Sequence, residues 1–576
     1  MIPINRTYAP VQAFVDELAR CGLRYAVTCP GSRNAPLALT FAADERIEAI
    51  SVLDERSAGF LALGIAKTER RPVVVTCTSG TASANLLPAI VEARESHVPL
   101  IVLTADRPPE LRDIGAGQAI DQIKIFGSFP KWFTEVGTHP PTRATGIHYR
   151  ALACRAWFTS EDGRPGPVHL NFPLREPLAP VAEHLDPEPW QGRPDGRPWT
   201  VVTEVPSDPS PTVIELLERD VLESETGAIV CGPTLEQIAV AAARLAAATG
   251  WPLLAEPASG VRCGPHDRSH VVAHYDALLR SERFVEAHRP ELVIRVGDTP
   301  TSKPLRAWLA DKRQIVIDRH SGWHEPTRRA ERLVAAAADS TLEMLAAALE
   351  SEPPTRASWL AAWRAADAVV PPALAAAPDP FEPKAYAALA DTLPDGAVVW
   401  LGSSMPVRDV ETFFPQSERA LRFISNRGAN GIDGTVSSAT GAALAGPDPC
   451  VLLTGELALL HDLGGALAAR RHGADVRIVC INNGGGGIFD FLPVAAHADP
   501  AHYREHIVTP SSVDLATVAS LAGLAHVRAE TPDDVRRAIT GPALVEVRTD
   551  REDNVRMHRE VFARVDAALS DALAQA

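Results

Sequence analysis

The feature that most constrains the fold is a pair of apolar runs, each ending in a polar, glycine-rich turn. The first run, 451–454, ends at Gly455-Glu456-Leu457, and the second, 476–481, ends at Asn482-Asn483 and four glycines. Because the intervening stretch has the length of one helix, the pattern predicts strand, turn, helix, strand. A βαβ crossover of this length brings both turns to the same edge of a parallel sheet.

The polar groups at these turns have the chemistry of a divalent-cation site. Glu456 offers a carboxylate, Asn483 an amide oxygen, and the glycine loop at Gly485 a backbone carbonyl. Oxygen ligands of these kinds suit Mg²⁺, and Mn²⁺ accepts them too. A cation held in this way would in turn hold a diphosphate.

Similar strand–helix alternation runs through the whole chain and predicts an α/β fold with parallel sheets flanked by helices. The predicted strands are 25–29, 50–53, 73–76, 100–103, 228–230, 292–296, 314–317, 398–401, 423–424, 451–454, 476–481 and 543–547. The predicted helices include an amphipathic one ending near Arg70, and 84–94 and 235–248. The order strand, Thr-and-Gly turn, helix, strand at 73–104 returns at 451–481, which fits a shared fold for the first and last parts.

Two proline-rich stretches divide the 576 residues into three segments. The first runs from about 178 to 211, and the second begins at Pro353-Pro354 and recurs at Pro371-Pro372 and Pro378-Asp379-Pro380. Proline fixes φ and cannot donate to a β-ladder, so both stretches are predicted to be extended connectors. The predicted domains are 1–185, 212–350 and 381–576.

Composition narrows the class of protein. The net charge of −16 disfavours binding to nucleic acid or to anionic lipid. No apolar run approaches the length of a membrane span, and the N-terminus lacks a secretory pattern, so we expect a cytoplasmic protein. The eight cysteines are scattered without a C-x-x-C pair, which favours buried reduced thiols over a metal site.

Glu55 follows the predicted strand 50–53 and precedes a helix. The pattern at Glu456 and Asn483 resembles the metal–diphosphate motif of thiamine-diphosphate enzymes. Such enzymes need one carboxyl group against the aminopyrimidine ring, where its hydrogen bond favours the imino tautomer that activates the cofactor. The alternative is that Asp54 or Glu55 caps the helix. The metal–diphosphate pattern at Glu456 and Asn483 favours the cofactor interpretation for Glu55.

Several longer motifs occur in order along the chain. They are 30–37 (PGSRNAPL), 54–58 (DERSA), 78–82 (TSGTA), 104–109 (TADRPP), 425–434 (SNRGANGIDG) and 482–489 (NNGGGGIF). Together they resemble the 2-succinyl-5-enolpyruvyl-6-hydroxy-3-cyclohexene-1-carboxylate synthase family, thiamine-diphosphate enzymes of the menaquinone pathway. The resemblance covers nearly the whole chain, and the run 425–434 is its most specific motif.

The resemblance implies a condensation of isochorismate with 2-oxoglutarate and release of CO₂. Both substrates are dicarboxylates, and arginine suits bidentate carboxylate contacts. The substrate-binding residues that it implies are Ser32, Arg33, Arg107, Gln118, Lys303, Arg408, Arg427, Phe489 and Leu492. Some members of the family carry a second base after the lysine, where this chain has Pro304. Each arginine taken alone could instead form a surface ion pair.

The resemblance also assigns cofactor contacts. They are Glu55, Ser404, Ile432, Glu456, Leu457, Asn483, Gly485 and Ile488, with Ser404 at the diphosphate and Ile432 supporting the bent cofactor. For Ile488, Phe489 and Leu492, core packing is the alternative. Glu456 stands where the family usually has Asp; a small backbone shift would keep the ligand, and weakened cofactor binding in a pseudoenzyme is the other outcome.

The resemblance further implies a homodimer or a dimer of dimers, with active sites at the subunit interface. Two alternative functions stay open. One is an acetohydroxyacid-synthase or 2-oxoacid-decarboxylase type enzyme acting on pyruvate, which would not need so many cations. The other is a non-catalytic relative that only binds ligands.

Overall fold

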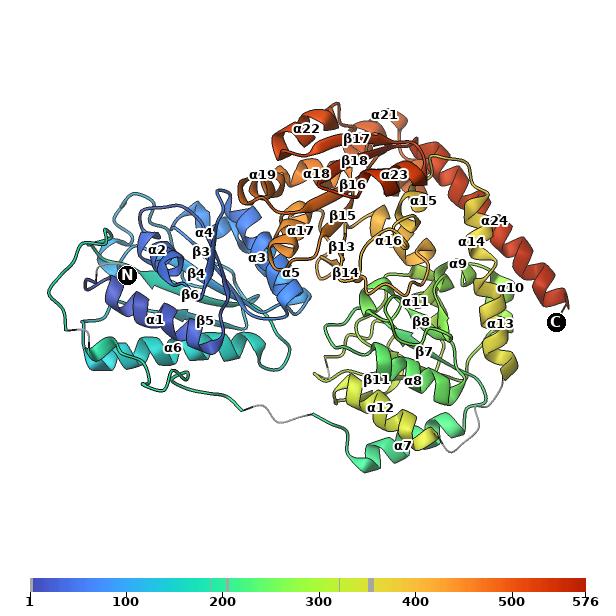
Figure 1. The fold of residues 1–576 in the computed structure, drawn as a ribbon, viewed down its shortest axis with the longest axis horizontal. Helices are drawn as coiled ribbons and strands as arrows, with labels where there is room; N and C mark the ends of the chain where they lie inside the picture. The colour runs from blue at the N-terminus through green and yellow to red at the C-terminus, as the bar shows by residue number, and fades with distance from the viewer. Residues whose placement is uncertain (1–3, 187, 204–206, 321, 351–356, 576) are drawn as a thin grey trace. The chain divides into compact units, whose positions relative to one another are not determined.

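The computed structural model describes residues 4–186, 188–203, 207–320, 322–350 and 357–575 (Figure 1). These residues form three six-stranded sheets, and the recorded strand pairings are parallel. The contacts divide the chain into two compact units. The first unit comprises 1–204, 426–447 and 460–476, and the second comprises 205–425, 448–459 and 477–576. The predicted α/β class with parallel sheets is confirmed.

The first unit contains one sheet, in the order β2-β1-β3-β4-β6-β5. Its strands are β1 (Tyr25–Thr28), β2 (Glu48–Ser51), β3 (Val73–Cys77), β4 (Leu100–Asp106), β5 (Trp132–Glu135) and β6 (Val168–Pro173). Its helices are α1 (Tyr8–Cys21), α2 (Ala35–Ala43), α3 (Glu55–Glu69), α4 (Thr81–Asn85), α5 (Leu87–Glu95), α6 (Arg143–Glu161), α17 (Thr435–Leu444) and α19 (Leu463–His472).

Side chains of this sheet alternate between two cores. Val73 and Val75 of β3 pack in a core with α3 and α5, whereas Val74 packs in the other core with α1, α2 and α6. Because both faces are covered, β1, β3 and β4 are buried along their whole length. Continuous apolar runs were the sequence signal for these strands.

The second unit contains the other two sheets. The middle sheet has the order β12-β11-β10-β7-β8-β9. Its strands are β7 (Gly227–Cys231), β8 (Leu253–Ala255), β9 (Val271–Val272), β10 (Leu292–Val296), β11 (Gln314–Ile317) and β12 (Ala330–Val334). The helices of this part are α7 (Pro211–Leu222), α8 (Ala239–Thr249), α9 (Tyr275–Leu278), α10 (Glu282–Ala287), α11 (Lys303–Leu309), α12 (Ala338–Leu349), α13 (Ala357–Asp367) and α14 (Val370–Ala375).

The third sheet has the order β14-β13-β15-β16-β18-β17, which repeats the topology of the first sheet strand for strand. Its strands are β13 (Val398–Leu401), β14 (Arg422–Ser425), β15 (Cys450–Gly455), β16 (Val476–Asn482), β17 (Ala525–Ala529) and β18 (Ala543–Arg548). The accompanying helices are α15 (Glu382–Ala387), α16 (Met405–Phe413), α18 (Glu456–His461), α20 (Val494–His497), α21 (Pro500–Tyr503), α22 (Leu515–Ala522), α23 (Pro532–Ala538) and α24 (Arg551–Gln575). The echo between 73–104 and 451–481 therefore reflects a repeated fold.

Helix α3 differs from the predicted amphipathic helix. Every residue from Ser57 to Thr68 is buried, because α17 packs closely on α3 within the first unit. A Cβ on Gly64 would lie 2.0 Å from the backbone oxygen of Ser438, and one on Gly441 would lie 2.1 Å from that of Leu61. Glycine at both positions lets the two backbones approach, and the buried face extends around the helix.

The second proline-rich stretch is also not the predicted extended connector. Pro371-Pro372 lie in the first turn of α14, where a missing N–H and a fixed φ are tolerated. Helix α13 precedes it, and Pro353-Pro354 lie outside the described residues. Between 178 and 211, the short 3-10 helix Glu188–Trp190 is the only helix or strand among the described residues before α7 begins at Pro211; Pro187 and Pro206 lie outside them.

Candidate active site

In the first unit, candidate substrate-binding side chains gather where β1, β3 and β4 end. Ser79, which follows β3, contacts both Arg107 and Gln118. The Arg107 guanidinium donates to Ser79 Oγ. Ser79 Oγ donates to the Gln118 carbonyl oxygen at 3.0 Å, and Gln118 Nε2 donates to the Ser79 carbonyl oxygen at 2.8 Å. Gly80, with φ +81°, allows this contact, since a Cβ there would lie 3.0 Å from Gln118 Cγ. The predicted residues Arg107 and Gln118 are thus brought together.

Arg33, after β1, adds a second cation to this edge. Its Nη1 donates to the Leu174 carbonyl oxygen at 2.8 Å and lies 3.6 Å from the exposed Glu176 carboxylate. Its Nε is buried with no hydrogen-bond partner among the described residues. Partial burial and then the positive charge of Arg33 lower the pKa of Arg107. Two cations this close favour an anion between them; Ser32, next to Arg33, is exposed.

Glu55 and Asp54 have separate roles at the start of α3. Asp54 is the N-cap, and its side chain accepts from the Ser57 N–H at 3.1 Å. Glu55 is the first helical residue, is half-buried, and makes no hydrogen bond or ion pair within the described part of the chain. The Glu55 charge also acts on the neighbouring Cys77 thiol: burial mainly, and the Glu55 carboxylate to a smaller extent, raise the pKa of Cys77. The capping alternative therefore applies to Asp54 and leaves the Glu55 carboxylate available for a ligand.

The segment that carries Arg427 is held by a buried ion pair. Glu92 of α5 accepts from the N–H groups of Gly428 and Ala429 at 3.0 and 2.7 Å, and Lys67 of α3 lies 3.2 Å from Glu92. Burial lowers the pKa of Lys67 even beside this carboxylate. The pair fixes the loop on which Arg427 and, further along, the half-buried Ile432 lie.

In the second unit, the loop after β13 carries further predicted site residues. Ser404 is the N-cap of α16 and has φ +77° and ψ −130°, a conformation almost confined to glycine. The Arg408 guanidinium donates to the Ser404 carbonyl oxygen from one turn into α16. Strained backbone of this kind is typical of functional sites, and here it precedes a helix N-terminus suited to an anion.

Asp276 connects two helices that carry cations. It accepts from Ser302, the N-cap of α11, at 2.6 Å and from Thr412 of α16 at 2.8 Å. Lys303 and Arg306 lie in the first turns of α11, and Arg408 lies one turn before Thr412. These three side chains are exposed and form no ion pair with any residue that the structure describes. Cations that are exposed and free of ion pairs are available to attract an anion.

The three predicted metal ligands meet where β15 and β16 end. Glu456 is buried, and its Oε1 accepts from the Gly485 N–H at 2.5 Å. Burial raises the pKa of Glu456, while the N–H groups of Gly485 and Asn483 oppose that shift. Asn483 Oδ1 is buried with no hydrogen-bond partner among the described residues. An orphaned amide oxygen beside a carboxylate and a glycine loop fits a hard cation.

Glu382 of α15 holds the Asn483 side chain. Asn483 Nδ2 donates to Glu382 Oε1 at 3.0 Å, and Thr549 Oγ1 donates to the same oxygen at 2.9 Å. Burial and then the nearby Asp409 carboxyl raise the pKa of Glu382 to about 7. The Nδ2 end of the amide is thus bound to Glu382, and Oδ1 is the end that has no partner among the described residues.

The apolar residues predicted near the ligand are not core residues. Phe489 is 37% exposed and Leu492 is 47% exposed, whereas Ile488 and Leu457 are half-buried. Phe489 and Ile488 lie in the short helix Gly487–Phe491 that follows the glycine loop. The alternative of plain core packing is therefore wrong for Phe489 and Leu492.

Three residues that contact or neighbour the predicted site residues, each within its own unit, were missing from the sequence prediction. Ser79 lay within the motif 78–82 directly after a strand, so its position was a usable signal. Arg306, one turn after Lys303, could have been found from helical spacing. Glu382 gave no signal, because it lies 101 positions from the amide that it binds.

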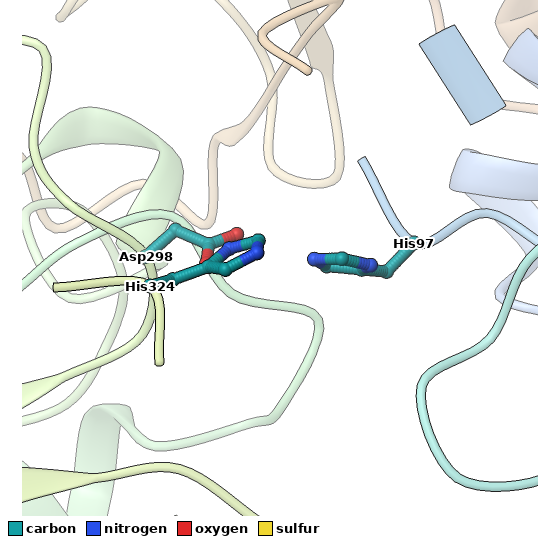
Figure 2. Close-up of side chains that lie close together, drawn as sticks. All are labelled: His97, Asp298 and His324. Carbon is teal, nitrogen blue, oxygen red and sulfur yellow. The ribbon is translucent and has the colours of Figure 1, made fainter. Parts of the chain in front are cut away.

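A pair of potential metal ligands lies elsewhere in the second unit. His324 Nδ1 lies 3.2 Å from Asp298 Oδ1 (Figure 2), and both side chains are about two-fifths exposed. His97, also labelled there, belongs to the first unit. An exposed pair of this kind is an ordinary surface contact.

Comparison with sequence families defines the class of protein. The thiamine pyrophosphate enzyme N-terminal TPP-binding domain matches residues 10–125, the middle domain of thiamine pyrophosphate enzymes matches 190–374, and the C-terminal TPP-binding domain matches 407–547. The chain is therefore a thiamine-diphosphate enzyme by fold and by sequence.

Similarity to curated proteins defines the family. The chain is 41% identical to the synthase of Geobacillus thermodenitrificans over 98% of its length and 97% of that protein. It is 42% identical to the Myxococcus xanthus synthase, covering 97% of both chains, and 42% identical to the Chloroflexus aurantiacus synthase, covering 98% and 97%. It belongs to the 2-succinyl-5-enolpyruvyl-6-hydroxy-3-cyclohexene-1-carboxylate synthase family.

Proposed function

We propose that this enzyme decarboxylates 2-oxoglutarate and adds the resulting carbanion to isochorismate, forming 2-succinyl-5-enolpyruvyl-6-hydroxy-3-cyclohexene-1-carboxylate. The choice of substrates is supported mainly by the cations that lie at the edges of the sheets. They are Arg33 and Arg107 in the first unit, and Lys303, Arg306 and Arg408 in the second. Each substrate has two carboxylates, and guanidinium groups bind carboxylates in a bidentate manner.

We infer that the cofactor is thiamine diphosphate with Mg²⁺ or Mn²⁺. Glu456, Asn483 and the Gly485 carbonyl would hold the metal, and Ser404 with the N-terminus of α16 would contact the diphosphate. The orphaned Asn483 Oδ1 supports this assignment. When bound, the cofactor supplies the electron sink that decarboxylation of a 2-oxo acid requires.

The chain's own residues then have distinct tasks. The Glu55 carboxyl would hold a proton against the aminopyrimidine, a role supported by its lack of a partner in the described chain. The carboxylates of the substrates would be oriented by Arg107, Gln118 and Arg427. The apolar face of the substrate ring would be covered by the partly exposed side chains of Phe489 and Leu492. Ser32, Ile432, Leu457 and Ile488 complete the proposed contacts.

The proposal extends to organisation. We propose domains at 1–185, 212–350 and 381–576, a homodimer or dimer of dimers with active sites at the subunit interface, and a cytoplasmic location. None of the described helices combines the length and apolar character required to span a bilayer.

The test is product formation by the purified full chain with thiamine diphosphate and Mg²⁺. We expect CO₂ release from 2-oxoglutarate to depend on isochorismate, with a product of the expected mass. Release of CO₂ from pyruvate with equal efficiency would favour an acetohydroxyacid-synthase or decarboxylase type enzyme. Cofactor binding without turnover of either acid would favour a non-catalytic relative.

A further inference from the structure

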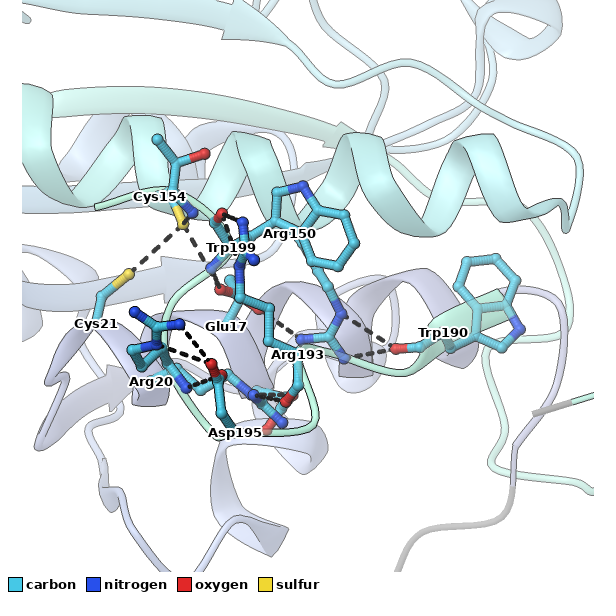
Figure 3. A network of polar contacts seen from close by, with 12 residues as sticks. Glu17, Arg20, Cys21, Arg150, Cys154, Trp190, Arg193, Asp195 and Trp199 are labelled. Carbon is cyan, nitrogen blue, oxygen red and sulfur yellow. Dashed lines mark hydrogen bonds and ion pairs between the residues drawn. The ribbon is translucent and has the colours of Figure 1, made fainter. Parts of the chain in front are cut away.

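Two cysteines of the first unit face each other across a helix pair. Cys21 is the last residue of α1 and Cys154 lies in α6, 133 positions later, yet their sulfur atoms are 3.8 Å apart (Figure 3). Cys21 is half-buried, and the other described cysteines are buried. The Cys21 thiol donates to Cys154 Sγ, so the two sulfur atoms are in direct contact.

The sulfur pair lies inside a polar network that binds the segment Trp190–Thr200. Cys154 Sγ accepts from the Thr200 N–H at 3.4 Å and donates to Glu17 at 3.6 Å. Glu17 is also bound by Arg150 at 2.6 Å and accepts from the Trp199 N–H. The network therefore ties α1, α6 and this segment together (Figure 3).

Further contacts fasten the same segment. Arg150 Nε donates to the Trp190 carbonyl oxygen at 3.2 Å, and Arg20 Nη1 donates to the Arg193 carbonyl oxygen at 2.9 Å. The hydrogen bond from Cys21 lowers the pKa of Cys154, with the Thr200 N–H acting in the same direction against burial. The partner thiol, Cys21, has a raised pKa because it donates to Cys154.

We propose that Cys21 and Cys154 form a reversible redox modification site, which peroxide or a low-molecular-weight disulfide converts into a disulfide. The inference is independent of the proposed function. The disulfide would join the end of α1 to α6 beneath the Trp190–Thr200 segment. It would close a long chain loop and so stabilise the first unit.

With hydrogen peroxide the chemistry balances as follows. One thiolate attacks an oxygen atom, so an S–O bond forms, the O–O bond breaks, and hydroxide leaves and is protonated to water. The second thiol then attacks that sulfur; the S–S bond forms, the S–O bond breaks, and a second water leaves. The two sulfurs lose two electrons and two protons in total, and the peroxide is reduced to two waters. With oxidised glutathione, one thiolate attacks a glutathione sulfur, so a mixed disulfide forms, the glutathione S–S bond breaks and one glutathione thiol leaves; the second cysteine then attacks the protein sulfur of the mixed disulfide, and the second glutathione thiol leaves.

The test uses the full-length chain treated separately with hydrogen peroxide and with oxidised glutathione, followed by mass spectrometry of non-reduced peptides. We expect a cross-linked peptide pair containing Cys21 and Cys154, loss of the mass of two hydrogens, and reversal by dithiothreitol. The oxidised protein should melt at a higher temperature. Cys21→Ser and Cys154→Ser should each abolish the cross-link and the rise in melting temperature. The control is Cys263→Ser, the same substitution at a different cysteine, which should keep both.

Some outcomes would overturn the proposal. Absence of the Cys21–Cys154 cross-link with both oxidants would do so, as would accumulation of sulfinic acid at Cys21 without any cross-link. A melting shift that persists in Cys21→Ser would also contradict it. Melting curves of the reduced variants show whether they fold, and Cys21→Ser, at the half-buried end of α1, is the variant least expected to disturb packing.

Discussion

Asp54 and Glu55 are adjacent carboxylates, but only Asp54 has a hydrogen-bond partner among the described residues, so substitutions can separate their roles. Glu55→Gln cannot ionise and should lose about 10²–10⁴-fold in turnover, as expected for a general acid–base group. The melting temperature should stay unchanged, because Glu55 has no partner among the described residues. Steady-state kinetics and thermal unfolding measure the two effects.

The neighbouring substitution is the control. Asp54→Ala removes the N-cap of α3 and should lower the free energy of unfolding by about 1 kcal/mol while leaving turnover near wild type. Equal losses of turnover in Asp54→Ala and Glu55→Gln would mean that both act through the helix, and the proposed role of Glu55 would then be wrong.

Two successive asparagines are held by two different glutamates, which offers another matched pair at the residue scale. Glu382 binds Asn483 at 3.0 Å, and Glu546 binds Asn482 at 2.7 Å. Glu382→Ala should weaken Mn²⁺ affinity by about 10–100-fold, the usual effect of losing a group that orients a metal ligand. Electron paramagnetic resonance titration of Mn²⁺ with thiamine diphosphate present measures this affinity without any turnover.

Glu546→Ala is the control, since it releases the asparagine that is not proposed to bind metal. It should leave Mn²⁺ affinity close to that of the wild type, and Glu382→Gln, which keeps an acceptor oxygen, should restore part of the loss. If Glu546→Ala weakens Mn²⁺ binding as much as Glu382→Ala, the effect is a general disturbance of the sheet edge.

At the scale of elements, the contact between α3 and α17 depends on glycine. Gly64→Ala places a methyl group 2.0 Å from the Ser438 carbonyl oxygen. It should therefore reduce the free energy of unfolding by about 1–3 kcal/mol, as overpacking of a close contact does. Gly446→Ala, where the added methyl meets nothing within 4 Å, should change it little. Similar denaturant midpoints for the two variants would contradict this account of the helix pair.

Strand β6 should make the first unit sensitive to acid. His169 is fully buried, its Nε2 lies 2.8 Å from Thr104 Oγ1, and burial lowers its pKa to about 3. Its pKa when unfolded is near 6.5. Between those values the unfolded state binds the extra proton, so stability is complete above about pH 6.5 and falls as the pH decreases.

The size of this effect can be measured. The free energy of unfolding should fall by about 2 kcal/mol between pH 7 and pH 5 because of His169 alone. His169→Gln, which cannot titrate, should show a smaller decrease over the same interval, whatever its stability at pH 7. Parallel pH profiles for the two proteins would show that His169 does not titrate on unfolding.

Helices and strands could be predicted from the sequence where the local pattern of apolar residues matches the way the element is buried in the fold. Buried strands such as β3 and β10 were found because they are continuous apolar runs, but β5 was missed because its four residues are only half-buried and lack that pattern. The burial of α3 on all sides depends on α17, some 375 residues later, so no local periodicity could reveal it. Likewise, the turn at Glu456 and Asn483 was visible in the sequence, whereas the distant Glu382 was not.

At the scale of the whole molecule, two sheets of the same topology each present polar loops at the carboxyl ends of their strands. The loops of the first carry Arg33, Glu55 and Arg107, and those of the third carry Ser404, Glu456 and Asn483. Parallel sheets bind ligands at this edge. The two sheets of this repeated fold thus carry different parts of the proposed site, a carboxylate and cations on the first and the proposed metal ligands on the third.

The central claim is that this enzyme uses 2-oxoglutarate, a dicarboxylate, as the donor to isochorismate. The most direct measurement is a competition between 2-oxoglutarate and pyruvate at a fixed isochorismate concentration, with both products quantified by mass spectrometry. A second carboxylate contact contributes about 1.5–3 kcal/mol, or roughly 10–150-fold at 1.4 kcal/mol per tenfold. We therefore expect the specificity constant for 2-oxoglutarate to exceed that for pyruvate by at least about tenfold. Equal specificity constants for the two acids would contradict the claim.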